Sequence, residues 1–219
     1  MNLKARIVHI RNRQRLLREA IAYQKDFEFW EETCVPSYCH PNPLAAFISW
    51  QRLFAAAEMA ARSGSPAKRV LDFGASIGEL GHLLPDGAQY DFVEENDAAA
   101  AFLLKQLPLS KRATLEAAPV GAYDRIFAID SLEHNKNYSQ LLDELVSKLA
   151  PDGVLVLSGP TENWLYKLGR RIAGFEGHYH ETNIHAIEAV AAQTLTRVAA
   201  KTIIPLAPLF RVTAWRRKK

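Results

Sequence analysis

The fold of this chain is decided by one stretch, which reads Val70-Leu71-Asp72-Phe73-Gly74-Ala75-Ser76-Ile77-Gly78-Glu79-Leu80. Its first four residues form a short apolar run that predicts a buried strand. Gly74 and Gly78 predict a turn whose backbone a ligand can approach closely. A helix is expected from Gly78, and its first backbone N–H groups would be unpaired and directed at that ligand.

A second strand, Tyr90–Glu94, is expected about twenty residues further on. It ends in the Glu94 carboxylate, which can accept hydrogen bonds from both hydroxyls of a ribose. The glycine turn and the acid at this spacing predict a nucleoside site. The simpler alternative is a glycine turn followed by an unrelated, solvated acid.

The remaining pattern alternates helical and strand-like segments, which predicts a parallel sheet with helices on both faces. After the last helix, two strand-like runs are joined by the short loop Pro205–Pro208, which favours an antiparallel hairpin at the sheet edge. The expected segments are a helix from Asp97, a weak strand Thr114–Glu116, a strand Arg125–Ile129, a helix carrying Leu141, Leu142, Leu145 and Leu149, a turn Pro151–Gly153, a strand Val154–Ser158, a helix Ile184–Ala192 and the runs Thr196–Ile204 and Phe210–Trp215.

Helical patterning dominates before Ala67. A loosely bounded helix is expected over residues 11–30, and a second begins after Asn42-Pro43, an N-cap followed by proline at the first helical position. We therefore expect residues 1–66 to form a helical cap or lid and residues 67–219 to form the ligand-binding domain.

From about Arg69 to its end, the chain resembles class I S-adenosylmethionine-dependent methyltransferases. Asp72, Gly74 and Gly78 match the family's first motif, with Ser76 where a glycine is usual. The resemblance implies a Rossmann-like, doubly wound, mostly parallel seven-stranded sheet with an antiparallel C-terminal hairpin. It also implies S-adenosylmethionine as cofactor, with these residues contacting it: Asp72, Gly74, Ala75, Ser76, Gly78, Glu94, Glu95, Glu116 and Asp130.

Two further segments, Ile129–His134 and Leu149–Pro160, resemble the small-molecule methyltransferases, so a small-molecule acceptor methylated on oxygen or nitrogen is expected. Imidazole is the side chain most often used as a base at neutral pH, and His134 is the first candidate to remove a proton from the acceptor. His178 and His180 are second candidates. The alternative for His134 is a packed histidine that holds a loop, and zinc at the later histidines is not expected.

The segment before the first strand is a plausible lid, so Tyr38 and His40 are candidates to touch the acceptor, with ordinary loop packing as the alternative. Trp164 and Tyr166 follow the fifth strand at the rim where open α/β sheets bind ligands. Core packing of Trp164 is the alternative to a place in the pocket wall.

Two other classes of function compete. A nucleic-acid or protein methyltransferase has only the basic chain ends in its favour, and a non-catalytic methyltransferase-like subunit is suggested by Ser76. A dehydrogenase is less favoured because Gly74 and Gly78 lack the third glycine of the dinucleotide pattern. Nucleic acid is not an expected partner.

The charge distribution is uneven although the net charge is only +3. Both ends are basic, and the N-terminal segment interleaves aliphatic and basic residues, which is typical of weak contact with an anionic membrane surface. A helix packed on the domain or on a second copy of the chain is the alternative. The two cysteines, Cys34 and Cys39, together with the lack of a signal-like or membrane-spanning apolar run, predict a cytoplasmic protein.

Overall fold

The computed structural model describes residues 1–21, 29–30, 33–62, 67–161, 181–204 and 208–218. Its centre is a seven-stranded sheet with the order β3-β2-β1-β4-β5-β7-β6. This arrangement confirms the fold predicted from the sequence. The strands are β1 (Arg69–Phe73), β2 (Gln89–Val93), β3 (Lys111–Arg112), β4 (Tyr123–Ile129), β5 (Leu149–Pro160), β6 (Leu195–Ile203) and β7 (Phe210–Arg217).

Strands β1 to β5 are parallel, and β7 lies antiparallel between β5 and β6. The predicted hairpin is therefore confirmed. The segment Pro151–Gly153, expected as a turn, instead lies inside β5, where the register with β4 shifts between Tyr123 and Arg125. The pairing with β4 passes from Leu149 directly to Val154, an irregularity in the ladder. Proline and glycine occur both in turns and at such irregularities, so the sequence could not separate the two.

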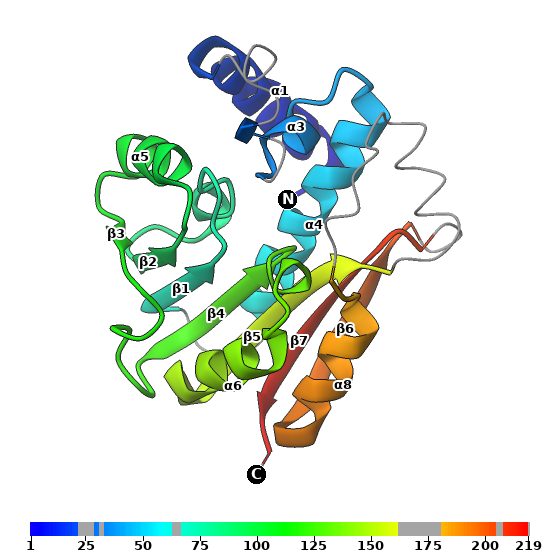
Figure 1. Ribbon diagram of the computed structural model, residues 1–219. Helices are drawn as coiled ribbons and strands as arrows, with labels where there is room; N and C mark the ends of the chain where they lie inside the picture. The colour runs from blue at the N-terminus through cyan, green and yellow to red at the C-terminus, as the bar shows by residue number, and fades with distance from the viewer. Residues whose placement is uncertain (22–28, 31–32, 63–66, 162–180, 205–207, 219) are drawn as a thin grey trace.

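Helices cover both faces of the sheet, as expected. Helices α4 (Pro43–Arg62) and α5 (Asp97–Gln106) pack on one face, and α6 (Tyr138–Lys148) and α8 (Ile184–Thr194) pack on the other. Figure 1 shows α6 and α8 in front of the strands and α4 behind them. Two apolar clusters, one on each side of the sheet, form the core.

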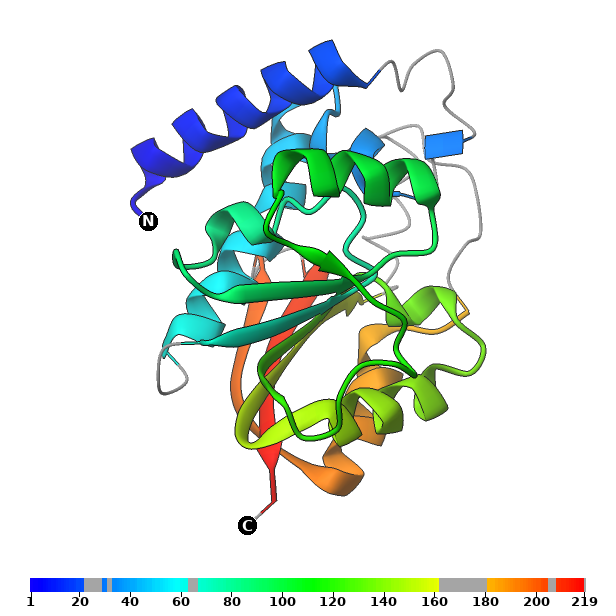
Figure 2. The same cartoon turned by 90° about the vertical axis from the view of Figure 1, so that its left-hand side faces the viewer.

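The first helix is displaced from its expected position. Instead of covering residues 11–30, α1 spans Leu3–Ala20, because the Asn2 side chain accepts a 2.9 Å hydrogen bond from the Ala5 N–H and caps it. Its Ile10 and Leu17 side chains are buried against the rest of the protein. Figure 2 shows α1 lying across the end of the molecule, above α5.

The predicted start of α4 is confirmed, since Asn42 Oδ1 accepts hydrogen bonds from the backbone N–H groups of Leu44 and Ala45. This helix contacts β4, β5, β6 and β7, and therefore forms a layer of the sandwich. A short helix, α3 (Val35–Tyr38), precedes it. The division of the chain into residues 1–66 and 67–219 stays a prediction.

The helix expected from Gly78 is absent. The chain between β1 and β2 forms turns and one 3-10 helix, η1 (Gly81–Leu83). Gly78 has φ +81°, a left-handed conformation that is incompatible with the start of an α-helix, and Pro85 and Gly87 follow soon after. The weak strand expected at Thr114–Glu116 is also misplaced. Strand β3 is only two residues long and exposed, so no apolar alternation marks it in the sequence.

No helix within the described residues is both long enough and apolar enough to cross a membrane.

Candidate active site

The residues predicted to bind the cofactor meet at the carboxyl edge of the parallel strands. Phe73, the last residue of β1, is paired with Val93 of β2 and Ala128 of β4, so the segments that follow these strands are neighbours. Gly74 and Ala75 donate backbone hydrogen bonds to the Val93 carbonyl over 2.9 and 3.2 Å. This edge is where open α/β sheets bind ligands.

The two glycines of the turn are required by packing as well as by backbone conformation. Gly74 has φ +72°, and a Cβ there would lie 2.4 Å from the Cβ of Ser131, in the segment after β4. A Cβ on Gly78 would lie 2.5 Å from Leu103 Cγ on α5. In the structure these glycines allow close approach between parts of the protein. Close approach by a ligand, which the sequence predicts, stays a prediction.

Ser76, which stands where the family has a glycine, adopts the left-handed conformation with φ +49°. Its backbone N–H donates a 2.6 Å hydrogen bond to Glu94 Oε2. Its Oγ is buried and has no hydrogen-bond partner among the described residues. Ser76 therefore adopts a backbone conformation that favours glycine.

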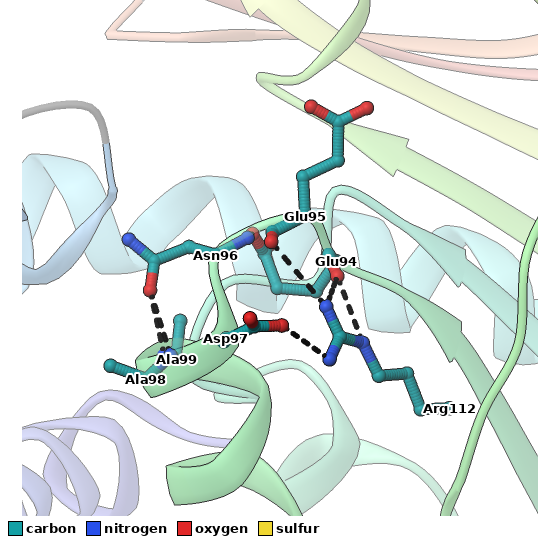
Figure 3. A network of polar contacts seen from close by, with 7 residues as sticks. All are labelled: Glu94, Glu95, Asn96, Asp97, Ala98, Ala99 and Arg112. Carbon is teal, nitrogen blue, oxygen red and sulfur yellow. Dashed lines mark hydrogen bonds and ion pairs between the residues drawn. The ribbon is translucent and has the colours of Figure 1, made fainter.

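Glu94 is held at the end of β2 by several contacts (Figure 3). Its Oε1 accepts a 2.8 Å hydrogen bond from the Asn96 N–H. The Arg112 guanidinium donates to the Glu94 carbonyl over 3.1 and 2.6 Å and forms a 2.7 Å ion pair with Asp97. Each carboxylate oxygen of Glu94 has a second lone pair, so the group can still accept hydroxyl hydrogen bonds.

The Asp72 side chain is buried in the sheet beneath the glycine turn and is not exposed at its carboxyl edge. It is 3% exposed, and its Oδ2 accepts a 2.5 Å hydrogen bond from the Tyr90 hydroxyl. Burial, opposed by the Tyr90 hydrogen bond and reinforced by nearby Glu94, raises the pKa of Asp72 to about 7. The carboxyl group thus joins β1 to β2 beneath the turn.

Asp130, directly after β4, has φ +51° and is paired with a cation. Arg52 of α4 forms an ion pair with Asp130 Oδ2, and the Ser158 hydroxyl donates a 2.9 Å hydrogen bond to Oδ1. The Arg52 guanidinium also stacks 4.3 Å from the centre of the Phe210 ring. Because Arg52 is only 5% exposed, the pair fixes a charged group beside the glycine turn in a largely dry environment.

The candidate acceptor and base residues differ in exposure. His134 ends the 3-10 helix η2 (Leu132–His134) and is exposed near Asp130. Tyr38 is 5% exposed, its ring packs on Trp50 with centroids 5.1 Å apart, and burial raises its pKa well above the ordinary value. His40 Nδ1 accepts a 3.0 Å hydrogen bond from the Asn42 N–H. The contacts of Tyr38 are thus those of a packed side chain, as in the alternative to an acceptor contact, and its contact with an acceptor stays a prediction.

Other predicted residues lie apart from this group. Ala75 belongs to the turn, but Glu95 is exposed and its side chain points away from the Glu94 contacts in Figure 3. The Glu116 carbonyl accepts a 3.5 Å hydrogen bond from Lys148, where α6 ends and β5 begins, so Glu116 lies away from the carboxyl edge. Four candidates fall outside the described residues: Trp164, Tyr166, His178 and His180.

Two site residues, Arg52 and Arg112, were not predicted. A charged residue between Trp50 and Leu53 on an apolar helix is the signal that could have identified Arg52. Arg112 lies in a two-residue strand and carries no such signal. Among the described residues, no cluster of His, Cys, Asp and Glu could hold a metal ion.

The geometry fits a nucleoside-containing cofactor. The turn and the Glu94 carboxylate lie at one edge of the sheet, and Glu94 retains lone pairs for a ribose. The adenosine of S-adenosylmethionine supplies the hydroxyls that such a carboxylate binds.

The chain belongs to the methyltransferase family: residues 46–201 match the family model described as a methyltransferase domain. No curated protein is similar enough in sequence to match. The fold is that of class I S-adenosylmethionine-dependent methyltransferases, and the chain is accordingly an enzyme of that class.

Three solved structures show the shared fold. The N-methyltransferase NodS from Bradyrhizobium japonicum, bound to S-adenosylhomocysteine, is 16% identical with a TM-score of 0.65, over 82% of this chain and 90% of that one. Magnesium protoporphyrin IX methyltransferase from Synechocystis, also bound to S-adenosylhomocysteine, is 16% identical with a TM-score of 0.68, over 89% and 95%. A Burkholderia thailandensis 1,6-didemethyltoxoflavin N1-methyltransferase is 20% identical with a TM-score of 0.59, over 90% of each chain.

Proposed function

We propose that this methyltransferase transfers a methyl group from S-adenosylmethionine to an oxygen or nitrogen atom of a small-molecule acceptor. The observation that carries the proposal is the Glu94 carboxylate, which accepts hydrogen bonds from the Ser76 and Asn96 N–H groups at the carboxyl edge of the sheet and has lone pairs left for a ribose. Support for a small acceptor comes from two proteins of similar structure, magnesium protoporphyrin IX methyltransferase and 1,6-didemethyltoxoflavin N1-methyltransferase, whose names give small-molecule acceptors.

The proposed chemistry asks the chain mainly to align its two substrates. The cofactor supplies a methyl group already activated on a sulfonium. The turn and Glu94 would hold the donor, and the edge near the Arg52–Asp130 pair would border the acceptor. Alignment for in-line attack accounts for most of the rate, and a histidine removes the acceptor proton where one must leave. His134 is the candidate nearest to Asp130 in the sequence, with His178 and His180 as further candidates.

The segment before β1 completes the proposed acceptor site. Arg52 comes from α4, and Tyr38 lies within the electrostatic reach of both Arg52 and Asp130. We infer that the segment 1–66 acts as a lid over the acceptor and that Tyr38 and His40 are its candidate contacts. Trp164 and Tyr166, outside the described residues, stay candidates from the sequence alone.

The test follows the methyl group. Purified protein is incubated with methyl-labelled S-adenosylmethionine and, separately, with the small-molecule, RNA and protein fractions of a bacterial extract. Label in the small-molecule fraction supports the proposal. Label confined to RNA or to protein overturns the choice of acceptor class, and absence of S-adenosylhomocysteine binding by calorimetric titration overturns the cofactor site.

A further inference from the structure

Helix α1 is attached to the segment that follows the glycine turn. The Arg13 guanidinium binds the Glu79 carboxylate through two hydrogen bonds, Nε to Oε2 over 2.8 Å and Nη2 to Oε1 over 2.6 Å. Glu79 immediately follows Gly78. A paired, planar contact of this kind fixes both the distance and the orientation of its partners.

The pair is shielded from water. The Glu79 side chain is 0% exposed and that of Arg13 is 12% exposed. Burial raises the pKa of Glu79, and the hydrogen bonds and charge of Arg13 oppose that shift. Removing one member of a buried pair is costly because the other charge is left without compensation.

Two histidines, His82 and His9, interact electrostatically with Arg13, and neither adds a second cation to the pair. Burial, Arg13 and His9 lower the pKa of His82, on η1, to about 4, and burial and Arg13 lower that of His9 on α1. Both imidazoles are therefore neutral at neutral pH. From α5, Gln106 approaches Arg13 with a 3.4 Å hydrogen bond and carries no charge.

The Arg13–Glu79 pair lies at the end of the Gly74–Gly78 turn, where fewer contacts with other strands hold the backbone. The start of the turn is held by the Val93 carbonyl and its centre by Glu94, but the helix that was expected to continue from Gly78 is absent. After Gly78, the backbone hydrogen bonds are the short-range ones of turns and a 3-10 helix. The contact with α1 is thus a long-range side-chain contact at the end of the turn, where no α-helix continues the chain, and it adds to the packing of Leu103 against Gly78.

We propose that Arg13 is a positioning residue for the methyl donor: it holds Glu79 and thereby fixes the backbone of the glycine turn in the conformation that binds S-adenosylmethionine. The inference rests on the proposed cofactor site. It gives the N-terminal helix a part in cofactor binding, although α1 lies outside the residues that match the family model.

The chain offers a matched control on the same helix. Arg6 is 14% exposed and forms an ion pair with Glu58 of α4, away from the turn. Replacement of either arginine loosens α1, but only Arg13→Ala releases Glu79. We expect Arg13→Ala to weaken S-adenosylhomocysteine binding by about tenfold or more, in titrations at a temperature where both variants are folded, and Arg6→Ala to bind like the wild type.

Two further variants keep the test decisive if Arg13→Ala does not fold. Arg13→Lys keeps the charge but loses the two-pronged contact, so its affinity should lie between those of the wild type and the alanine variant. The reversed pair, Arg13→Glu with Glu79→Arg, should bind more tightly than Arg13→Glu alone. Hydrogen exchange of the Ser76–Leu80 amides should be faster in Arg13→Lys than in Arg6→Ala.

The outcomes separate the two hypotheses. Wild-type protein that does not bind S-adenosylhomocysteine contradicts the cofactor site and, with it, the role of Arg13. Wild-type binding that is unaffected by Arg13→Lys, or equally affected by Arg6→Ala, contradicts the role of Arg13 alone. A lower melting temperature with unchanged affinity assigns Arg13 to the docking of α1 only and overturns the inference.

Discussion

The carboxylate of Glu94 accepts a 2.6 Å hydrogen bond from the backbone N–H of Ser76. This contact joins the acid at the end of β2 to the centre of the glycine turn after β1. A ribose that binds Glu94 would therefore contact a carboxylate whose position depends on the conformation of the turn. If Glu94 binds the ribose as we propose, order in the turn and affinity for the nucleoside would be coupled through this carboxylate.

Replacing Glu94 by alanine should weaken S-adenosylhomocysteine binding by about tenfold or more, because a charge-assisted hydrogen bond to the ligand and the contact with Ser76 are lost together. Glu95→Ala is the matched control, since the neighbouring side chain is exposed and points away (Figure 3). Calorimetric titration of both variants decides the matter, and unchanged affinity in Glu94→Ala removes this residue from the site.

Ser76→Gly should stabilise the protein by about 1 kcal/mol, because φ +49° strains an L-residue and suits glycine. Ser139→Gly, at an exposed position of α6, should instead lower the free energy of unfolding by about 0.5–1 kcal/mol. Urea unfolding measures both changes. A loss of stability in both variants would show that the Ser76 side chain contributes more than the strain costs.

Elements with strong local signals were predictable. Strands β1, β2, β4 and β5 are apolar runs, α4 has an N-cap and a proline at its start, and the short loop before β7 required an antiparallel hairpin. A helix was predicted after Gly78 but the structure has none there. The sequence could not show its absence, because glycine at this position is compatible with a helix N-terminus or with a turn. Only the packing of α5 against Gly78 distinguishes them.

The candidate site was predictable only where its residues follow strands directly. Glu94 was predicted as the acid that ends the second strand, and Asp130 was predicted from the resemblance of the segment after the fourth strand to methyltransferases. In the structure both follow neighbouring parallel strands. Arg13, Arg52 and Arg112 each contact the site from a distant part of the sequence. Their charges look like ordinary solvated side chains until tertiary structure pairs them with Glu79, Asp130 and Asp97.

Asp72 should make the protein less stable as pH rises. Its pKa is about 7 in the folded protein and 3.8 in the unfolded chain, so its contribution to stability is complete below pH 3.8 and is lost as pH rises through 7. Between pH 5 and 8 the loss is about 2–3 kcal/mol. Asp72→Asn removes this dependence while still accepting the Tyr90 hydrogen bond.

The measurement compares urea unfolding of Asp72→Asn and wild type at both pH values. Tyr90 and Glu94 face Asp72, and histidines titrate in the same range, so the difference between the two proteins isolates the contribution of this carboxyl group. Asp143→Asn, at an exposed position on α6, should retain the wild-type dependence. Parallel curves for Asp72→Asn and the wild type would contradict the raised pKa.

One of the three histidine candidates should matter for the methyl-transfer rate. Once an acceptor is identified, replacing the base by alanine should lower the rate by at least about tenfold, the low end for lost general-base catalysis. His134→Ala, His178→Ala and His180→Ala are compared with His185→Ala, which changes an exposed histidine on α8. If none of the three slows the reaction relative to His185→Ala, alignment of the substrates is sufficient without a histidine base.

The structure changes what the basic N-terminal helix can be expected to do at a membrane. Ile10 and Leu17 are buried against the protein, so they are not available for insertion into lipid. The exposed surface of α1 carries Lys4, Arg11 and Arg15, together with Leu3 and Val8, which are 60% and 57% exposed. Contact with anionic lipid would then be mainly electrostatic, at about 1 kcal/mol for each basic residue.

We therefore expect part of the protein to sediment with anionic vesicles at low salt and to stay in the supernatant at high salt, because salt screens exposed charges. The variant with Lys4→Glu, Arg11→Glu and Arg15→Glu should stay in the supernatant at both salt concentrations. It leaves Arg13 unchanged, so its affinity for S-adenosylhomocysteine should match that of the wild type and show that the site is intact. Equal recovery of wild type and variant in the supernatant at low salt would limit α1 to packing against the domain, since an exposed basic surface that attracted lipid would have separated them.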